Sequence, residues 1–177
     1  AGKCSEEEVY KIEMLMNQAG ITVHNRPVVD VALSRAEETE TPAAALELAE
    51  GRMITGKTTD LLGPCAALLL NALKELAGIP HSQPVISPAA IEPIQTLKTQ
   101  YLGSKNPRLH MDEVLIALSV SAASDPNAQK ALEQLPNLKG CQAHTSVMVS
   151  DVDRKLFMKL SIQATFEAKY ENNSVIF

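Results

Sequence analysis

The chain has 177 residues, of which 45% are hydrophobic and 21% charged, and its formal net charge is −5. Such values are typical of a globular protein with one domain, or one domain with an insertion. The acidic balance and an aromatic content of 3% argue against a nucleic-acid surface, which needs basic or stacking side chains. No apolar run reaches the roughly 18 residues of a membrane span, so neither nucleic acid nor a membrane is an expected partner.

The cysteines indicate a reducing environment. Cys4, Cys65 and Cys141 lie far apart, and no C-x-x-C pair occurs. An odd, dispersed set does not form a disulfide framework, so we expect a cytoplasmic location. The first residues are not a signal peptide and enter a helix almost directly without an initiator Met, which indicates a fragment or a processed chain.

The first half of the chain predicts two helices, a hairpin and a buried helix. Ser5 and Glu8 have the spacing of a capping box before a helix over residues 6–18, and Pro27 opens a helix over residues 28–38. Two apolar runs flank Glu50-Gly51, a turn signal, which predicts a hairpin over residues 43–56. The leucine-rich run that starts at Gly63-Pro64 predicts a helix to Ala77, buried against a sheet.

The second half predicts a helical block and then a return to strands. Prolines make residues 79–87 irregular, and three helices without an intervening strand follow at residues 88–102, 111–124 and 126–135. Strands are expected over residues 142–149 and 161–167, joined by a helix over residues 150–159.

These elements predict an α/β fold in three layers: a small mixed sheet flanked by helices, with an inserted helical subdomain. The expected segments are an N-terminal helix and linker, the first half of the α/β core, the helical insertion and the second half of the core. Their bounds are residues 1–25, 26–84, 85–138 and 139–177.

The loop from Gly56 to Asp60 is the best candidate site. Gly56 lets the backbone approach a ligand closely, and Lys57 supplies a cation. Thr58 and Thr59 add hydroxyls, and Asp60 adds a carboxylate that could act as a base or bind a cation. The helix that follows turns its positive end toward this loop, so a phosphorylated or carboxylated small molecule is the expected ligand. The structural alternative is that Thr58 or Asp60 only satisfies free amides of that helix.

The same stretch matches the P-loop pattern G-x-x-x-x-G-K-[ST] from Gly51 to Thr58. A P-loop needs a helix that starts at the lysine, but Gly63-Pro64 places the helix start later, and residues 52–55 look like a strand. We therefore favour the second strand of a hairpin, with nucleotide binding kept as an alternative.

Three residues outside this loop are weaker candidates. Lys105 and Arg108 precede a helix N-terminus and could hold an anion, although a solvated loop is the commoner outcome. His144 shares one face of its strand with Gln142 and Ser146, and an exposed polar face there suggests a cleft or an interface. A half-buried, hydrogen-bonded histidine is the commoner structural outcome.

Motifs for metal and hydrolase sites are absent. The sequence has no H-E-x-x-H, H-x-E, P-C-x-x-C or G-x-S-x-G, and its histidines, His24, His81, His110 and His144, lie in different segments. The sequence predicts no metal and no cofactor.

Five segments together resemble the C-terminal part of the bacterial DUF1846 (UPF0371) family. They are Gly51–Leu62, Leu70–Ile79, Leu102–Pro107, Ile116–Ser119 and Leu138–His144. The resemblance covers nearly the whole chain and implies a piece of a much longer protein, in a family without an established activity.

The order of helix, hairpin, Thr-Gly, acidic loop and buried helix is also similar to the start of a cytidine-deaminase-like three-layer fold. In that fold the zinc ligands and the catalytic Glu follow the Thr-Gly and begin the helix. Here Lys57, Asp60 and Cys65–Ala67 stand near those places, so the resemblance implies the architecture without the zinc ligands.

Two functional hypotheses follow. The first is a non-catalytic α/β module for assembly, with the N-terminal part of the same protein or a second copy as partner; the missing motifs and the polar face around His144 motivate it. The second is a small-anion or nucleotide site, with or without catalysis, at Gly56–Asp60.

Overall fold

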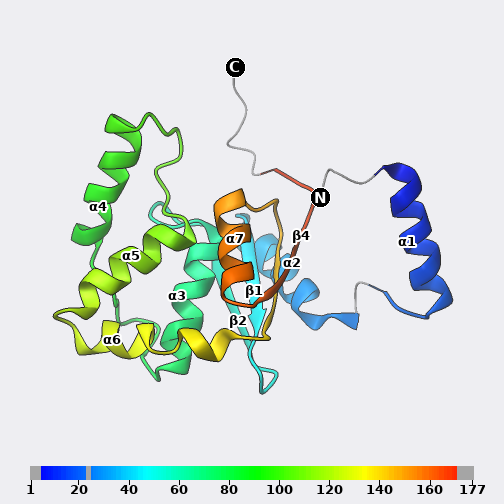
Figure 1. Ribbon diagram of the computed structural model, residues 1–177, viewed down its shortest axis with the longest axis horizontal. Helices are drawn as coiled ribbons and strands as arrows, with labels where there is room; N and C mark the ends of the chain where they lie inside the picture. Colours follow the sequence, from blue (N-terminus) through cyan, green and yellow to red (C-terminus); the bar gives the residue numbers. More distant parts are fainter. Residues whose placement is uncertain (1–4, 23–24, 171–177) are drawn as a thin grey trace.

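Figure 1 shows the computed structural model, which describes residues 5–22 and 25–170 and leaves Cys4 and His24 outside. The helices are α1 (Glu6–Gln18), α2 (Pro27–Thr39), α3 (Pro64–Leu76), α4 (Pro88–Thr96), α5 (Met111–Ala122), α6 (Pro126–Leu132) and α7 (Asp151–Lys159). The strands are β1 (Ala43–Glu47), β2 (Met53–Lys57), β3 (Gln142–Thr145) and β4 (Gln163–Phe166). A π-helical turn, Leu97–Tyr101, follows α4, and a 3-10 turn, Leu135–Leu138, follows α6.

The strands form one mixed sheet in the order β2-β1-β3-β4. β1 is antiparallel to both of its neighbours, whereas β3 and β4 are parallel. β2, β3 and β4 therefore run in the same direction, and their carboxyl ends meet at one edge of the sheet. The hairpin turn between β1 and β2 uses Gly51 with φ +84°, a conformation that favours glycine.

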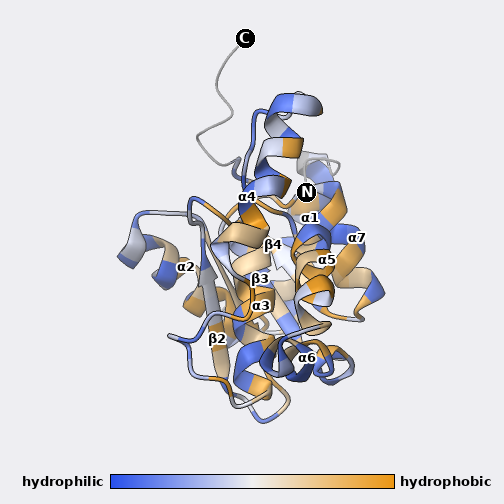
Figure 2. Ribbon diagram, turned by 90° about the vertical axis from the view of Figure 1, so that its left-hand side faces the viewer, coloured by the Kyte–Doolittle hydropathy of each residue, from blue (hydrophilic) through white to orange (hydrophobic). Residues whose placement is uncertain are grey.

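Helices cover both faces of the sheet, which confirms the predicted three-layer α/β fold. On one face, α2 packs Val28, Val29 and Ala32 against Ala45 of β1. On the other face, α3 and α7 pack against the sheet in a larger hydrophobic cluster, which also takes in α5 and α6 behind α3. Figure 2 shows the mainly apolar colouring of α3 and α5, as their buried positions require.

The helices α4, α5 and α6 lie between α3 and β3 in the chain, with no strand among them. Their buried side chains belong to the same hydrophobic cluster as those of α3 and the sheet. The inserted helical block therefore shares its core with the α/β layers, and the predicted segment boundaries stay predictions.

Two predicted strands are shorter than expected for local reasons. β3 ends at Thr145 because the next antiparallel pair is completed by a side chain: Ser146 N–H donates to Ala43 O, but Ala43 N–H donates to the hydroxyl of Ser146 at 3.0 Å. β4 begins only at Gln163, because Ser161 has φ 56°, in the left-handed region that no strand uses.

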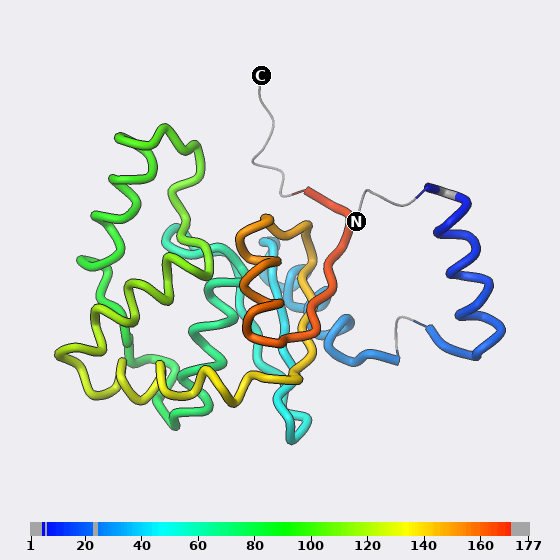
Figure 3. The backbone as a smooth tube through the Cα atoms, viewed as in Figure 1, coloured from blue at the N-terminus to red at the C-terminus, as the bar shows by residue number. Residues whose placement is uncertain are grey.

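Helix α1 stands apart from the layered body in Figures 1 and 3. Its apolar residues Val9, Ile12 and Leu15 are all exposed. No helix in the described part of the chain is long and apolar enough to span a membrane.

Gly56 lies where β2 touches α3. A Cβ atom at this position would stand 2.2 Å from the backbone nitrogen of Leu68, far inside contact distance. The close backbone approach that the sequence assigns to a ligand at Gly56 is therefore made by helix α3.

We expect Gly56→Ala to lower the free energy of unfolding by about 3 kcal/mol or more, because strand and helix must separate to admit the methyl group. Chemical denaturation measures this loss. Gly63→Ala is the matched control, since its Cβ would meet nothing closer than Leu109 O at 3.7 Å, and about 1 kcal/mol or less is expected. Equal losses in the two variants would contradict the packing argument.

Candidate functional site

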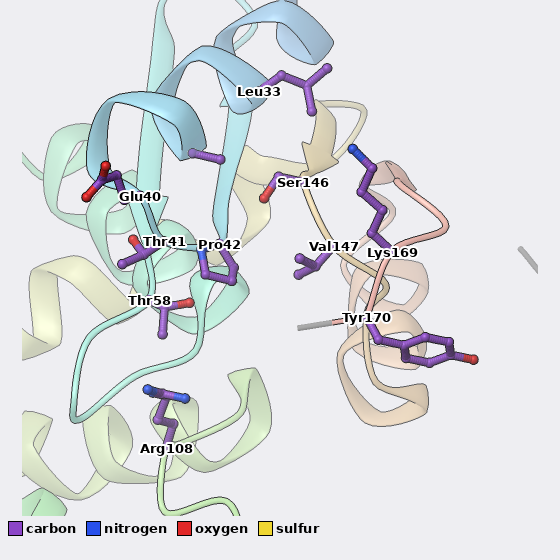
Figure 4. Close-up of a pocket in the computed structure, with 11 residues that line it drawn as sticks. Leu33, Glu40, Thr41, Pro42, Thr58, Arg108, Ser146, Val147, Lys169 and Tyr170 are labelled. Atoms are coloured by element: carbon purple, nitrogen blue, oxygen red, sulfur yellow. The ribbon is translucent and has the colours of Figure 1, made fainter. Parts of the chain in front are cut away.

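An open cleft of about 1000 Å³ lies at the carboxyl ends of β2 and β3. Figure 4 shows Thr58 and Arg108 on one side of it, with Ser146, Val147 and Lys169 toward the other. This is the edge of an α/β sheet where ligands usually bind, because strand ends and helix N-termini meet there. We call this space the outer cleft.

Thr58 carries an unsatisfied polar group in the outer cleft. The residue is 7% exposed, and its Oγ1 has no hydrogen-bond partner among the described residues. Its backbone N–H donates to Pro42 O at 2.8 Å, which fixes the residue at the end of the hairpin. In Figure 4 the hydroxyl points toward the interior of the cleft. A buried hydroxyl without a partner costs free energy that a ligand atom could recover.

Arg108 comes from a different part of the chain and reaches the same loop. Its Nε donates to Thr59 O at 2.8 Å. The next residue, Leu109, exchanges two backbone hydrogen bonds with the loop, from its own N–H to Leu61 O and from Gly63 N–H to its carbonyl. The structure thus brings together two sites that the sequence predicts separately.

A buried lysine holds this segment in place. Lys98 is 6% exposed, and its Nζ donates to Arg108 O at 2.5 Å and to Glu113 Oε2 at 2.8 Å. The same Glu113 oxygen accepts the backbone N–H of His110 at 2.8 Å. The backbone is therefore fixed on both sides of Leu109.

A smaller space of about 280 Å³, here called the inner chamber, adjoins the outer cleft. The two share the lining residues Arg108, Val147 and Tyr170. The N-cap residues of α3, α5 and α7, which are Gly63, His110 and Ser150, all line the chamber. Three positive helix ends therefore converge on it.

The carboxylate of Asp153 accepts hydrogen bonds at the N-termini of two of these helices. The residue is 7% exposed, and its Oδ1 accepts Met111 N–H at 2.8 Å. Its Oδ2 accepts the hydroxyl of Ser150 at 3.1 Å and lies 3.2 Å from Nδ1 of His110. One carboxylate thus ties the N-termini of α5 and α7 together.

Asp153 also sets the protonation of His110. The hydrogen bond to Asp153 raises the pKa of His110 above its ordinary value, against the opposing effect of partial burial. Cys65 lines the same chamber, but burial raises the pKa of its thiol well above the usual range. His110, and not Cys65, is the group that exchanges protons near neutral pH.

Gly56, Lys57 and Thr59 line a separate pocket of about 450 Å³ beside β2 and α3, and not the outer cleft. Lys57 is exposed and belongs to β2, and α3 begins only at Pro64, so the helix at the lysine that a P-loop needs is not formed. The hydroxyl of Thr59 accepts the N–H groups of Leu61 and Leu62. Asp60 is exposed.

Lys105, predicted together with Arg108, does not join the site. It is exposed and lines neither the outer cleft nor the inner chamber.

His144 lies on the face of the sheet that α2 covers, and it is 4% exposed. Its Nδ1 pairs with Thr165 Oγ1 at 2.8 Å, and its Nε2 lies 3.2 Å from Glu167 Oε1 without hydrogen-bond geometry. Arg26 covers the neighbouring Gln142, donating to its Oε1 at 2.7 Å. The expectation of an exposed polar face around His144 is therefore wrong. Burial lowers the pKa of His144, against the opposing charge of Glu167.

His110 and Asp153 were not among the residues predicted for the site. The pattern Ser150-x-x-Asp153 indicates a helix cap, and Ser150 does accept Asp153 N–H at 3.1 Å. His110 directly precedes a helix, as many capping residues do. The one available signal was that both lie at the start of a predicted helix. Among the residues that the structure describes, no three His, Cys, Asp or Glu side chains come together as a metal site.

The comparisons with known proteins agree on one family. The family model "Domain of unknown function DUF1846, C-terminal" matches residues 24–176. The chain is 53% identical to a UPF0371 protein of Corynebacterium glutamicum over 165 residues, which are 93% of this chain and 33% of that protein. It is 48% identical to a UPF0371 protein of Streptococcus pneumoniae over 171 residues, which are 97% of this chain and 35% of that protein. The chain thus spans about a third of the length of these relatives.

The environments of His110 and His144 predict opposite pH behaviour for the two side chains. In NMR titrations we expect His110 to titrate above the ordinary histidine pKa of about 6.5 and His144 below it. The raised pKa of His110 stabilises the folded chain fully below the ordinary value, and this contribution is lost as the pH rises through the raised pKa. For His144 the contribution is present above the ordinary value and is lost as the pH falls through the lowered pKa.

Asp153→Asn should lower the pKa of His110, because the hydrogen bond to the Asp153 carboxylate is the largest cause of the raised pKa. His144, on the other face of the sheet, is the internal control and should not move. An unchanged His110 pKa in this variant would contradict the assignment.

Proposed function

The chain belongs to the DUF1846 (UPF0371) family, and from the site we propose that this domain binds a small anionic molecule in the outer cleft. The observation that carries the proposal is the buried, unpartnered hydroxyl of Thr58 in the same cleft as the guanidinium of Arg108. A phosphate or carboxylate there would accept from both groups, one of them charge-assisted. This retains the predicted ligand class at Thr58, while moving the cation from Lys57 to Arg108.

The charges around the outer cleft favour an anion. Arg108 and Lys169 face it from two different segments, and Glu40 is the one acidic side chain in its described lining. Since Lys57 lies outside this lining and the helix does not start there, the arrangement supports a small anion more than a nucleoside triphosphate.

Calorimetric titration with inorganic phosphate and with ATP·Mg²⁺ tests this function. Arg108→Gln should weaken phosphate binding by roughly 10- to 100-fold, because a charge-assisted hydrogen bond is lost. Thr58→Val keeps the side-chain shape and should weaken binding by roughly fivefold while leaving the ligand-free protein as stable or more stable.

Lys105→Gln is the matched control for charge, since Lys105 is on the same loop as Arg108 but lines neither space. We expect it to bind phosphate as the unmodified chain does. Equal losses in the Lys105 and Arg108 variants, or no binding at millimolar phosphate, would exclude the site. A clear preference for ATP·Mg²⁺ would instead favour the nucleotide alternative.

A second candidate function, contact with the preceding part of the same protein, is favoured by α1. This helix exposes Val9 by 45%, Ile12 by 51% and Leu15 by 64%. It precedes the family match, which begins at residue 24, and the relatives are about three times as long as this chain. We propose that the apolar face of α1 packs on that longer N-terminal part, in preference to a second copy.

Hydrogen exchange distinguishes the N-terminal part of the protein from a second copy of the chain as the partner of α1. The amides of α1 should exchange rapidly in the 177-residue chain and slowly in the full-length protein, because only the latter covers the helix. The amides of α2 are the control and should be protected in both. Slow exchange of α1 in the short chain, together with a dimer in light scattering, would show that a second copy is the partner instead.

A further inference from the structure

We propose that His110, positioned by Asp153, acts as the general base in the hydrolysis of a small phosphate monoester held by Arg108. This inference deepens and rests on the anion-binding function proposed above. It concerns the inner chamber, whereas anion binding alone requires only the outer cleft.

The first support is the fixed geometry of the pair. Asp153 is held by Met111 N–H and by the hydroxyl of Ser150, so its Oδ2 has one position relative to His110 Nδ1. An imidazole held at Nδ1 presents Nε2 from the opposite edge of the ring. An oriented carboxylate that pairs with Nδ1 keeps the correct tautomer and stabilises the imidazolium.

The second support is access. The side chain of His110 is 30% exposed and lines the inner chamber, although its carboxylate partner is buried. Within residues 5–22 and 25–170, Nε2 of His110 has no hydrogen-bond partner. A histidine that only linked two helices would use Nδ1 for that contact and would not need to line a cavity.

The third support is a place where the phosphoryl group could bind. Arg108 lines both the chamber and the cleft, so one guanidinium could hold an anion that spans them. α3 starts at the chamber wall with no side-chain cap, and its positive end favours an anion there. A space of about 280 Å³ admits a phosphoryl group, and the rest of the molecule would extend into the outer cleft.

The chemical step balances within these groups and water. His110 Nε2 takes a proton from a water molecule, whose oxygen attacks phosphorus as the P–O bond to the leaving group breaks. The electron pair of that bond goes to the leaving oxygen, which lies opposite the attacking water in an in-line displacement and takes its proton from solvent, while the imidazolium releases the proton of the attacking water to solvent. The products are an alcohol and inorganic phosphate. Asp153 neither takes up nor gives up a proton in this step and acts as a positioning residue for His110.

Turnover of p-nitrophenyl phosphate by the 177-residue chain tests the pair. We expect His110→Gln to lower kcat by at least about 100-fold, the usual size of general acid–base catalysis. Asp153→Asn should lower kcat less and move the pH profile to lower pH, because His110 loses the carboxylate that raises its pKa. Arg108→Gln should mainly raise KM. His144→Gln, on the other face of the sheet, is the control and should keep the turnover unchanged.

The outcomes separate this inference from the binding function. Phosphate binding without turnover, or equal turnover in His110→Gln, overturns the role of His110 as general base and leaves the anion site standing. Loss of phosphate binding itself removes both. If Asp153→Asn does not fold, the imidazole nitrogen spectrum of the unmodified chain decides: added phosphate should shift the Nε2 resonance of His110, and an unmoved resonance overturns the proposal.

Discussion

The buried ammonium of Lys98 is the constraint on which the candidate site depends. An ammonium group that is 6% exposed must have its donors satisfied, and here it bonds to Arg108 O and Glu113 Oε2. Because Glu113 also accepts the backbone N–H of His110, the ion pair between Lys98 and Glu113 fixes the backbone before and after Leu109. Arg108 is thereby held at the outer cleft and His110 at the inner chamber.

The direction of the strands explains why the site lies at one edge of the sheet. β2, β3 and β4 end there, and the helices α3, α5 and α7 begin there, so backbone amides with no helical partner accumulate. Asp153 and Ser150 satisfy the starts of α5 and α7, whereas α3 has no side-chain cap. The positive potential that remains lies beside α3 and Arg108, where an anion is expected.

Local patterns predicted the fold well, because apolar spacing, turn residues and caps act over a few neighbours. The site could not be predicted in this way, because it is formed by contacts between residues that are far apart in the chain. His110 and Asp153 are 43 positions apart in the chain, and the sequence between them carries no signal of their hydrogen bond. Gly56 was predicted to let the backbone approach a ligand, and the sequence does not reveal that the backbone of α3 lies there. The alternation of side chains along the strand predicted which residues share a face with His144. It did not predict that Arg26 covers the neighbouring Gln142.

The polar groups buried at this edge argue for a ligand site within the domain itself. Thr58, Lys98 and Asp153 are each 6–7% exposed, and burial of such groups costs free energy even when they are paired. A module that served only to contact other domains would be as stable, or more stable, with apolar side chains at these positions. Clustering of such costly groups around two adjoining cavities is typical of functional sites. The chain spans about a third of the length of its relatives, and the buried polar residues of this edge all lie within it.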